Sequence, residues 1–299
     1  MSWAAHELET YVLQKHLKTR ASYVAMLFGV LLPDLFTKLP VYGINVGKSS
    51  FLKAGTPFRY HRGWPGVGFT HTLFFSAVVA LLVLRITRQR AWFIGVLLGG
   101  WSHVFTDVFD SAGTMVFFPF STQHYSAGMW GYAAQAGRYG DAAAYYSSLG
   151  GVWDFFWLCM VVFTARTVLR ADYFVDVVVP NDPFWPWVRR RFALSPRVML
   201  ALYRSFFVYG SSRIFGWFLW SRVFNPQRGT QVLDWTWRGP HWISAVSFPW
   251  PGFAVFAENT ARGAIALTAF FVVVWWLLGR HLWSNAGVAA AGLVHEASS

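Results

Sequence analysis

The chain has 299 residues, of which 55% are hydrophobic and only 13% are charged. A typical soluble domain carries about 25% charged residues, so this composition argues against a soluble globular protein and favours a membrane protein built of helices. The formal net charge is +12, but no nucleic-acid-binding module is recognisable in the sequence. We therefore expect no nucleic acid partner, and expect membrane lipids with anionic headgroups instead. The single cysteine, Cys159, excludes an internal disulfide framework.

The first 68 residues predict two helices and a loop. Residues 3–18 are typical of a short, fairly polar helix, and residues 21–36 are apolar. The two predicted helices have similar lengths at the helical rise, so an antiparallel hairpin would bring His6 and Asp34 to the same end. Residues 37–68 are rich in glycine and proline, and a loop of this length in a compact protein is usually functional or disordered.

Further apolar segments approach the roughly 20 residues that cross a bilayer as a helix. They occupy residues 69–86, 91–109, 151–168 and 264–278. Arginines follow the first and third of these segments, and a basic turn at 15–20 precedes the apolar residues 21–36. Positive charge favours the cytoplasmic side, so all three basic sites are expected there. The sequence thus predicts a multi-pass protein of the inner (plasma) membrane, with the histidines and aspartates of its first half toward the outer face.

Residues 171–299 have a different character. The breaker cluster 182–186 (DPFWP) begins a stretch in which arginines alternate with aromatic residues up to residue 224. This pattern is typical of helices in or beside the membrane interface, although a span at about 200–220 is an open alternative. The predicted fold class is all-α: a polytopic transmembrane bundle with interfacial amphipathic helices in the C-terminal half. We divide it into a membrane-embedded domain at 1–170 and an Arg/aromatic-rich region with a final transmembrane helix at 171–299.

One histidine and one aspartate, His103 and Asp107, stand four residues apart within an apolar segment. On a helix this spacing places both side chains on one face, where together they can bind a metal ion. Ionisable groups at membrane depth cost roughly 2.5–3.5 kcal/mol each on insertion scales, so they are seldom retained without a function. The predicted topology gathers further candidates at the same depth, and the full set of candidate metal ligands is His6, Asp34, His61, His71, His103 and Asp107.

This set contains only imidazoles and carboxylates, which suit zinc, manganese or iron. We expect a divalent metal, zinc first and manganese as the alternative. Metal sites of this kind hydrolyse phosphate esters and related bonds, with a carboxylate accepting the proton of the attacking water. Asp34, His71 and Asp107 are the candidate catalytic residues, and Arg62 is the candidate for binding an anionic substrate.

Several of the ionisable residues also have a simpler interpretation. His71 at a helix start could be an interfacial histidine, and Asp154 near the start of its span could reach water. Glu7 and Glu9 are interpreted as charges near the start of a helix rather than as catalytic bases. Two further groups could extend the site: Asp110 by supporting the metal ligands, and His124 as an additional ligand.

Five ordered motifs resemble the bacterial membrane-bound metal-dependent hydrolases of the YdjM-like family. They are LLPD (31–34), HRG (61–63), THTL (70–73), SHVFTD (102–107) and AGTMVFFP (112–119), after an early histidine at His6. The resemblance covers about residues 1–120 and implies that the six candidate ligands are the metal-site positions of a hydrolase. The sequence departs from the family pattern at Phe36, where a second acidic residue is expected. The HRG and TH motifs are also separated here by the extra residues WPGVGF.

Two functions follow as hypotheses. The first is an integral membrane hydrolase that uses metal-activated water on a lipid or membrane-associated ester. The order of the histidines and aspartates also resembles that of zinc-dependent phospholipases C, which points to a phosphodiester. The alternative is a catalytically inactive membrane scaffold or complex subunit that retains a hydrolase-like fold and binds a membrane protein partner.

Overall fold

The computed structural model describes residues 3–17, 21–35, 45–46, 49–50, 62–63, 68–131, 137–223, 241–243, 268–269 and 272–283. These residues are mostly helical, which confirms the predicted all-α class. The strands found among them are only two or three residues long. β1 (Asn45–Val46) pairs antiparallel with β2 (Ser49–Ser50), and β3 (His124–Ser126) pairs antiparallel with β4 (His241–Ile243).

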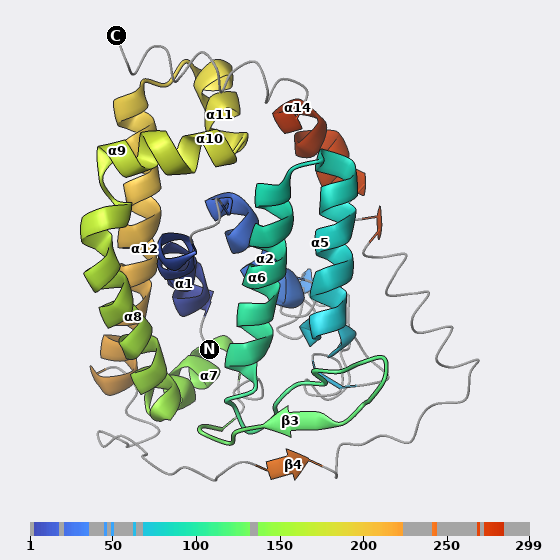
Figure 1. Ribbon diagram of the computed structural model, residues 1–299. Coiled ribbons are helices and arrows are strands. Elements are labelled where there is room, and N and C mark those ends of the chain that lie inside the picture. Colours follow the sequence, from blue (N-terminus) through green and yellow to red (C-terminus); the bar gives the residue numbers. More distant parts are fainter. Residues whose placement is uncertain are drawn as a thin grey trace.

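Except for α7, which lies between two predicted segments, the helices of the first 170 residues begin and end close to the predicted segments. They are α1 (Trp3–His16), α2 (Tyr23–Leu35), the 3₁₀ turn η1 (Gly68–His71), α5 (Leu73–Thr87), α6 (Arg90–Asp107), α7 (Gly137–Tyr146) and α8 (Leu149–Val168). Figure 1 shows α5, α6 and α8 as upright helices, with α1 and α2 between them. The proline of the LLPD motif, Pro33, lies inside α2, which continues to Leu35.

The second half combines several short helices with one long helix. The short elements are α9 (Ala171–Tyr173), the π-helical turn η2 (Phe174–Val178), α10 (Val179–Asn181), α11 (Phe184–Phe192), the π-helical turn η5 (Trp275–Gly279) and α14 (Arg280–Trp283). The long helix is α12 (Pro196–Val223), whose 28 residues at 1.5 Å each give a length of about 42 Å. It runs back past α8 and α1 (Figure 1), so residues 200–220 form part of one continuous helix.

Helix length and composition identify one described helix, α8, as long and apolar enough to cross a bilayer. Helices α2 and α5 are apolar but shorter. Of the predicted final span at 264–278, the structure describes residues 268–269 and 272–278, which are helical. The multi-pass topology and the division of the chain at residue 170 stay predictions.

Helices α2 and α6 pack backbone against backbone through three glycines. A Cβ atom on Gly29 would overlap the Val96 backbone, and one on Gly99 would overlap the carbonyl oxygen of Met26. One on Gly95 would lie 2.8 Å from the Cβ of Ala25. Small residues at spacing four allow such close approach between membrane helices, where packing takes the place of the hydrophobic effect. This contact fixes the end of α2, with Asp34, beside the end of α6.

Helix α1 is enclosed by α2, α8 and α12. Its Tyr11 hydroxyl donates a hydrogen bond of 3.0 Å to the carbonyl oxygen of Tyr203 in α12. Glu7 forms an ion pair of 2.6 Å with Arg213 of α12. The main hydrophobic cluster contains residues of α1, α8 and α12, including Leu8 and Val161, both of which are fully buried. The polar helix at the N-terminus is therefore a central element of the fold.

Asp182, between α10 and α11, caps the N-terminus of α2. Its carboxylate accepts a hydrogen bond from the Ser22 hydroxyl and others from the backbone N–H groups of Tyr23 (3.2 Å) and Val24 (3.5 Å). Asp182 is fully buried. A carboxylate at this place satisfies donors that have no partner within the helix and interacts favourably with the helix dipole.

Asp154 of α8 is also fully buried, so the interpretation that it reaches water is wrong. Two tyrosines at the end of α7 enclose it: the hydroxyl of Tyr145 donates to one carboxylate oxygen at 2.7 Å and that of Tyr146 to the other at 2.9 Å. Side chains close in sequence, eight and nine residues earlier, thus satisfy a carboxylate within the one described helix that is long and apolar enough to cross a bilayer.

Gly99→Ala tests the close packing of α2 and α6. The added methyl group overlaps the Met26 carbonyl, so we expect a loss of stability of about 1–3 kcal/mol, as for other overpacked sites, seen as a lower midpoint of thermal unfolding in detergent. Gly216→Ala is the matched control, since Gly216 lies in helix α12 with no atom within 4 Å of an added Cβ. An equal effect of both substitutions would show that the contact is not specific.

Asp182→Ala tests the cap of α2. It leaves buried backbone donors without an acceptor, which costs about 1–3 kcal/mol, so the unfolding midpoint should fall. Asp172→Ala is the control, because Asp172 is exposed and pairs with the exposed Arg170. Unchanged stability of the Asp182 variant would contradict the role of this carboxylate as a cap.

Candidate functional site

Five of the six predicted metal ligands lie together where α1, α2, η1 and α6 meet. They are His6, Asp34, His71, His103 and Asp107, and each is at most 3% exposed. They come from four elements that are distant in the sequence. The sixth, His61, lies outside the described residues.

The side chains of this cluster contact one another. The Nε2 atom of His103 lies 2.9 Å from Oδ2 of Asp107, one helical turn away. The Nε2 atom of His71 lies 3.3 Å from Oδ1 of Asp34 and 3.8 Å from Oδ2 of Asp107. The His6 ring stacks on that of His103, with 4.2 Å between the ring centroids.

Each of the three imidazoles has a hydrogen-bond acceptor at Nδ1. Nδ1 of His103 lies 2.7 Å from the carbonyl oxygen of Val30 in α2, and Nδ1 of His6 lies 3.3 Å from Oε1 of Glu9. Nδ1 of His71 lies 3.0 Å from the Thr70 hydroxyl, which donates its own proton to the carbonyl oxygen of Pro33.

These acceptors assign the proton of each neutral ring to Nδ1 and leave a lone pair on Nε2. The Nε2 atoms of His71 and His103 then face carboxylate oxygens, and a lone pair facing a carboxylate is repulsive unless a cation or a proton lies between them. Histidines that bind metals typically donate their other N–H to a carbonyl or carboxylate in this way.

Two groups of three ligand atoms within 4.8 Å of one another meet the geometric requirement for a metal. One is His6, His103 and Asp107, and the other is Asp34, His71 and His103. Nε2 of His6 has no hydrogen-bond partner among the described residues, although it is fully buried. An unpartnered buried nitrogen is costly, and coordination of a metal would satisfy it. The side chains present therefore fit a divalent ion.

Arg62 closes one side of the cluster. Its guanidinium lies 2.7 Å from Oδ2 of Asp107 and 3.3 Å from Oδ2 of Asp110, and it donates a hydrogen bond of 3.1 Å to the carbonyl oxygen of Gly113. The side chain is 4% exposed. Gly68 permits this placement, because a Cβ at Gly68 would overlap the backbone of Arg62.

Asp110 and His124 lie beside the cluster, in the polar region after α6. Oδ1 of Asp110 accepts the backbone N–H groups of Ala112 and Gly113, both at 2.9 Å. Burial raises the pKa of this carboxyl, and the Arg62 guanidinium opposes that rise. Nδ1 of His124 lies 3.2 Å from the carbonyl oxygen of Ala112, and burial lowers its pKa to about 4. Neither residue belongs to the two groups above.

Glu9 is a residue whose role the sequence interpretation missed. It lies in the middle of α1 and is fully buried, and its carboxylate contacts His6. The sequence did indicate the contact between His6 and Glu9, because a spacing of three places the two side chains on one helix face. The interpretation of Glu9 as a charge at a helix start was wrong, because α1 begins at Trp3 and its Glu9 face is covered by other helices.

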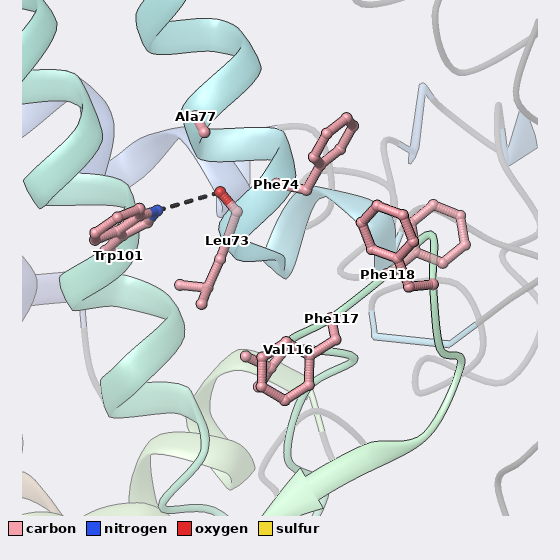
Figure 2. A pocket seen from close by; sticks show the side chains of 8 residues that line it. Leu73, Phe74, Ala77, Trp101, Val116, Phe117 and Phe118 are labelled. Atoms are coloured by element: carbon pink, nitrogen blue, oxygen red, sulfur yellow. Dashed lines mark hydrogen bonds between the residues drawn. The ribbon is translucent and has the colours of Figure 1, made fainter.

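An apolar pocket of about 270 Å³ lies between α5, α6 and the loop after α6. Leu73 and Phe74 line it at the start of α5, Trp101 lines it from α6, and Val116 and Phe117 line it from the following loop. Figure 2 shows the hydrogen bond of 3.2 Å from the Trp101 indole to the carbonyl oxygen of Leu73, which joins the two helices at this pocket. Phe74 and Phe117 are about half exposed, so the pocket opens at the surface.

The family model described as YdjM inner membrane protein matches residues 4–173. This range is more than half of the chain and contains every residue of the cluster. No curated protein and no solved structure matches the chain.

Proposed function

Because the chain belongs to the YdjM inner membrane protein family, we propose that it is a multi-pass inner-membrane hydrolase. Its buried histidines and aspartates would hold a divalent metal ion, zinc first and manganese as the alternative. The substrate would be an ester of a lipid or another membrane-associated molecule, a phosphodiester among the candidates.

One observation carries this proposal. The Nε2 atoms of His6, His71 and His103 converge with the carboxylates of Asp34 and Asp107, while each Nδ1 is held by an acceptor of its own. A purely structural cluster would gain stability by pairing each Nε2 with a donor. Nε2 of His6, buried without a hydrogen-bond partner among the described residues and beside these carboxylates, is what a cation site would satisfy.

The residues of the cluster would divide the catalytic work. A bound metal would supply a Lewis acid for the ester and lower the pKa of water. The Nε2 atoms of the histidines would be occupied in holding it, so the carboxylates of Asp34 and Asp107 are the groups able to accept a proton from the attacking water. His71 would help to hold the ion beside the Asp34 carboxylate, whose Oδ1 lies 3.3 Å from its Nε2.

The positions of the arginines support an outer-face site. Arg90 begins α6 and Asp107 ends it, so they are separated by about 26 Å at 1.5 Å per residue, close to the hydrocarbon thickness of a bilayer. Arg85 and Arg88, at the end of α5, lie at the same end as Arg90 (Figure 1). Arginine-rich turns favour the cytoplasm, which would leave the cluster near the opposite surface.

The aromatic pocket supports a lipid as the substrate. Helix α6 lines the pocket with Trp101 and carries His103, and α5, which lines it with Leu73 and Phe74, begins two residues after His71. Exposed Phe74, Trp101 and Phe117 would meet the lipid near the headgroup level, where aromatic side chains are favoured. Anionic headgroups would meet the arginines of the second half, such as Arg189, Arg190 and Arg191 at the end of α11.

His103→Ala tests the metal site. His103 belongs to both groups of candidate ligands, so its loss should lower metal affinity by about 100-fold or more. Mutation of a residue that only hydrogen-bonds a metal ligand typically lowers the affinity by roughly 10–100-fold. The measurement is metal content of the protein purified in detergent, together with hydrolysis of phospholipid esters in mixed micelles. The exposed His281→Ala is the control. Wild-type protein without bound metal would overturn the proposal and favour the scaffold alternative, as would hydrolysis unaffected by His103→Ala.

Glu9→Gln tests the partner of His6. The amide removes the charge that orients the ring and holds the proton on Nδ1, so we expect metal affinity to fall by about 10–100-fold. Glu7→Gln is the matched control in the same helix, since Glu7 pairs with Arg213 instead. If competition with a chelator gives the same affinity for the Glu9 variant as for the wild type, Glu9 has no part in the site.

A further inference from the structure

Asp107 has cationic or potentially cationic groups on two sides. Its Oδ2 atom lies 2.9 Å from Nε2 of His103 and 2.7 Å from the Arg62 guanidinium. A carboxylate in this position can bridge two positive charges, as carboxylates do between the ions of two-metal sites, which lie about 3.5–4 Å apart. Here one of the two positions is taken by a side chain of the protein itself.

The histidines supply ligands for a single ion. The two groups of candidate ligands share His103, and one imidazole nitrogen coordinates one ion. The two groups therefore cannot each hold an ion through His103 at the same time, and the cluster offers complete sets of three ligands for one ion only. No third group of this kind is found among the residues that the structure describes.

The oxygens on the other side of Asp107 are arranged around the guanidinium. Oδ2 of Asp110 lies 3.3 Å from Arg62, and the carbonyl oxygen of Gly113 accepts a hydrogen bond from it. Oδ1 of Asp110 is held by two backbone N–H groups, which fix the orientation of the carboxylate. Two carboxylates and a carbonyl are hard oxygen ligands that would suit a second divalent ion, but the planar, permanently charged guanidinium fills their centre.

We infer that Arg62 is the second cation of this site: the cluster takes a single divalent metal ion, and the guanidinium beside Asp107 and Asp110 occupies the place of a second. This inference rests on the proposed function and specifies the metal number. Arg62 is on this account a positioning residue that holds Asp107, instead of the binding group for an anionic substrate suggested by its sequence context.

The test is metal stoichiometry with a spectroscopic readout. Wild-type protein in detergent is loaded with Mn²⁺, freed of excess ion, and analysed for manganese per chain and by electron paramagnetic resonance. We expect one ion per chain and the six-line spectrum of an isolated Mn²⁺. Two ions with an exchange-coupled spectrum would overturn this inference and leave the proposed function intact. Absence of bound ion, with zinc as well as manganese, would overturn both.

Arg62→Ala provides the complementary measurement. Removal of the guanidinium leaves Asp107, Asp110 and the Gly113 carbonyl to a second ion, so the variant should bind up to two Mn²⁺ per chain and show exchange coupling. Arg62→Lys keeps the charge and should stay at one ion, and exposed Arg85→Ala is the control for the loss of an arginine. A variant with Arg62→Ala that folds and still binds one ion would contradict the inference. If it does not fold, the wild-type spectrum decides.

Discussion

The close approach of α2 and α6 determines the geometry of the cluster. Three glycines let the two backbones touch, and the hydrogen bond from His103 to the carbonyl oxygen of Val30 then fixes the rotation of α6 against α2. Asp34 at the end of α2 can meet His103 only because no side chain separates the helices. The remaining contributors, α1 and η1, pack around this pair of helices and add His6 and His71.

The polar groups around the cluster act mainly by orientation. Val30, Thr70 and Glu9 each place a hydrogen-bond acceptor at an imidazole Nδ1, and each does so from a different element. The lone pairs on Nε2 are thus turned toward the carboxylates of Asp34 and Asp107, which lie 3.3 Å from His71 and 2.9 Å from His103. Arg62 and Asp110 perform the same task for Asp107. An arrangement that fixes ligands before any ion binds reduces the entropy lost on binding.

Sequence patterns predicted the contacts that follow from the spacing of residues along a helix and from their position along the predicted membrane segments. The separation of four between His103 and Asp107, and the similar lengths of the first two helices, were enough to predict that residues from several segments meet. Contacts that depend on tertiary packing were not accessible in this way. Nothing local in the sequence indicates that Glu9 is covered by other helices, that Asp182 caps a helix 160 residues away, or that Arg62 pairs with two carboxylates. The long α12 was ambiguous because its arginines lower the hydropathy of a helix that is otherwise long enough to span.

The buried carboxylate of Asp154 has a consequence for the biogenesis of the protein. An aspartate inside a helix that enters the bilayer costs about 2.5–3.5 kcal/mol on insertion scales, and the hydroxyls of Tyr145 and Tyr146 offset this cost only once α7 has folded back onto α8. Both tyrosines precede α8 in the chain, so they are synthesised before Asp154. The hydrogen bonds to the Asp154 carboxylate therefore require no segment that is synthesised later. On the proposed membrane topology, α7 and α8 would therefore insert as one hairpin, against which α1 and α12 pack.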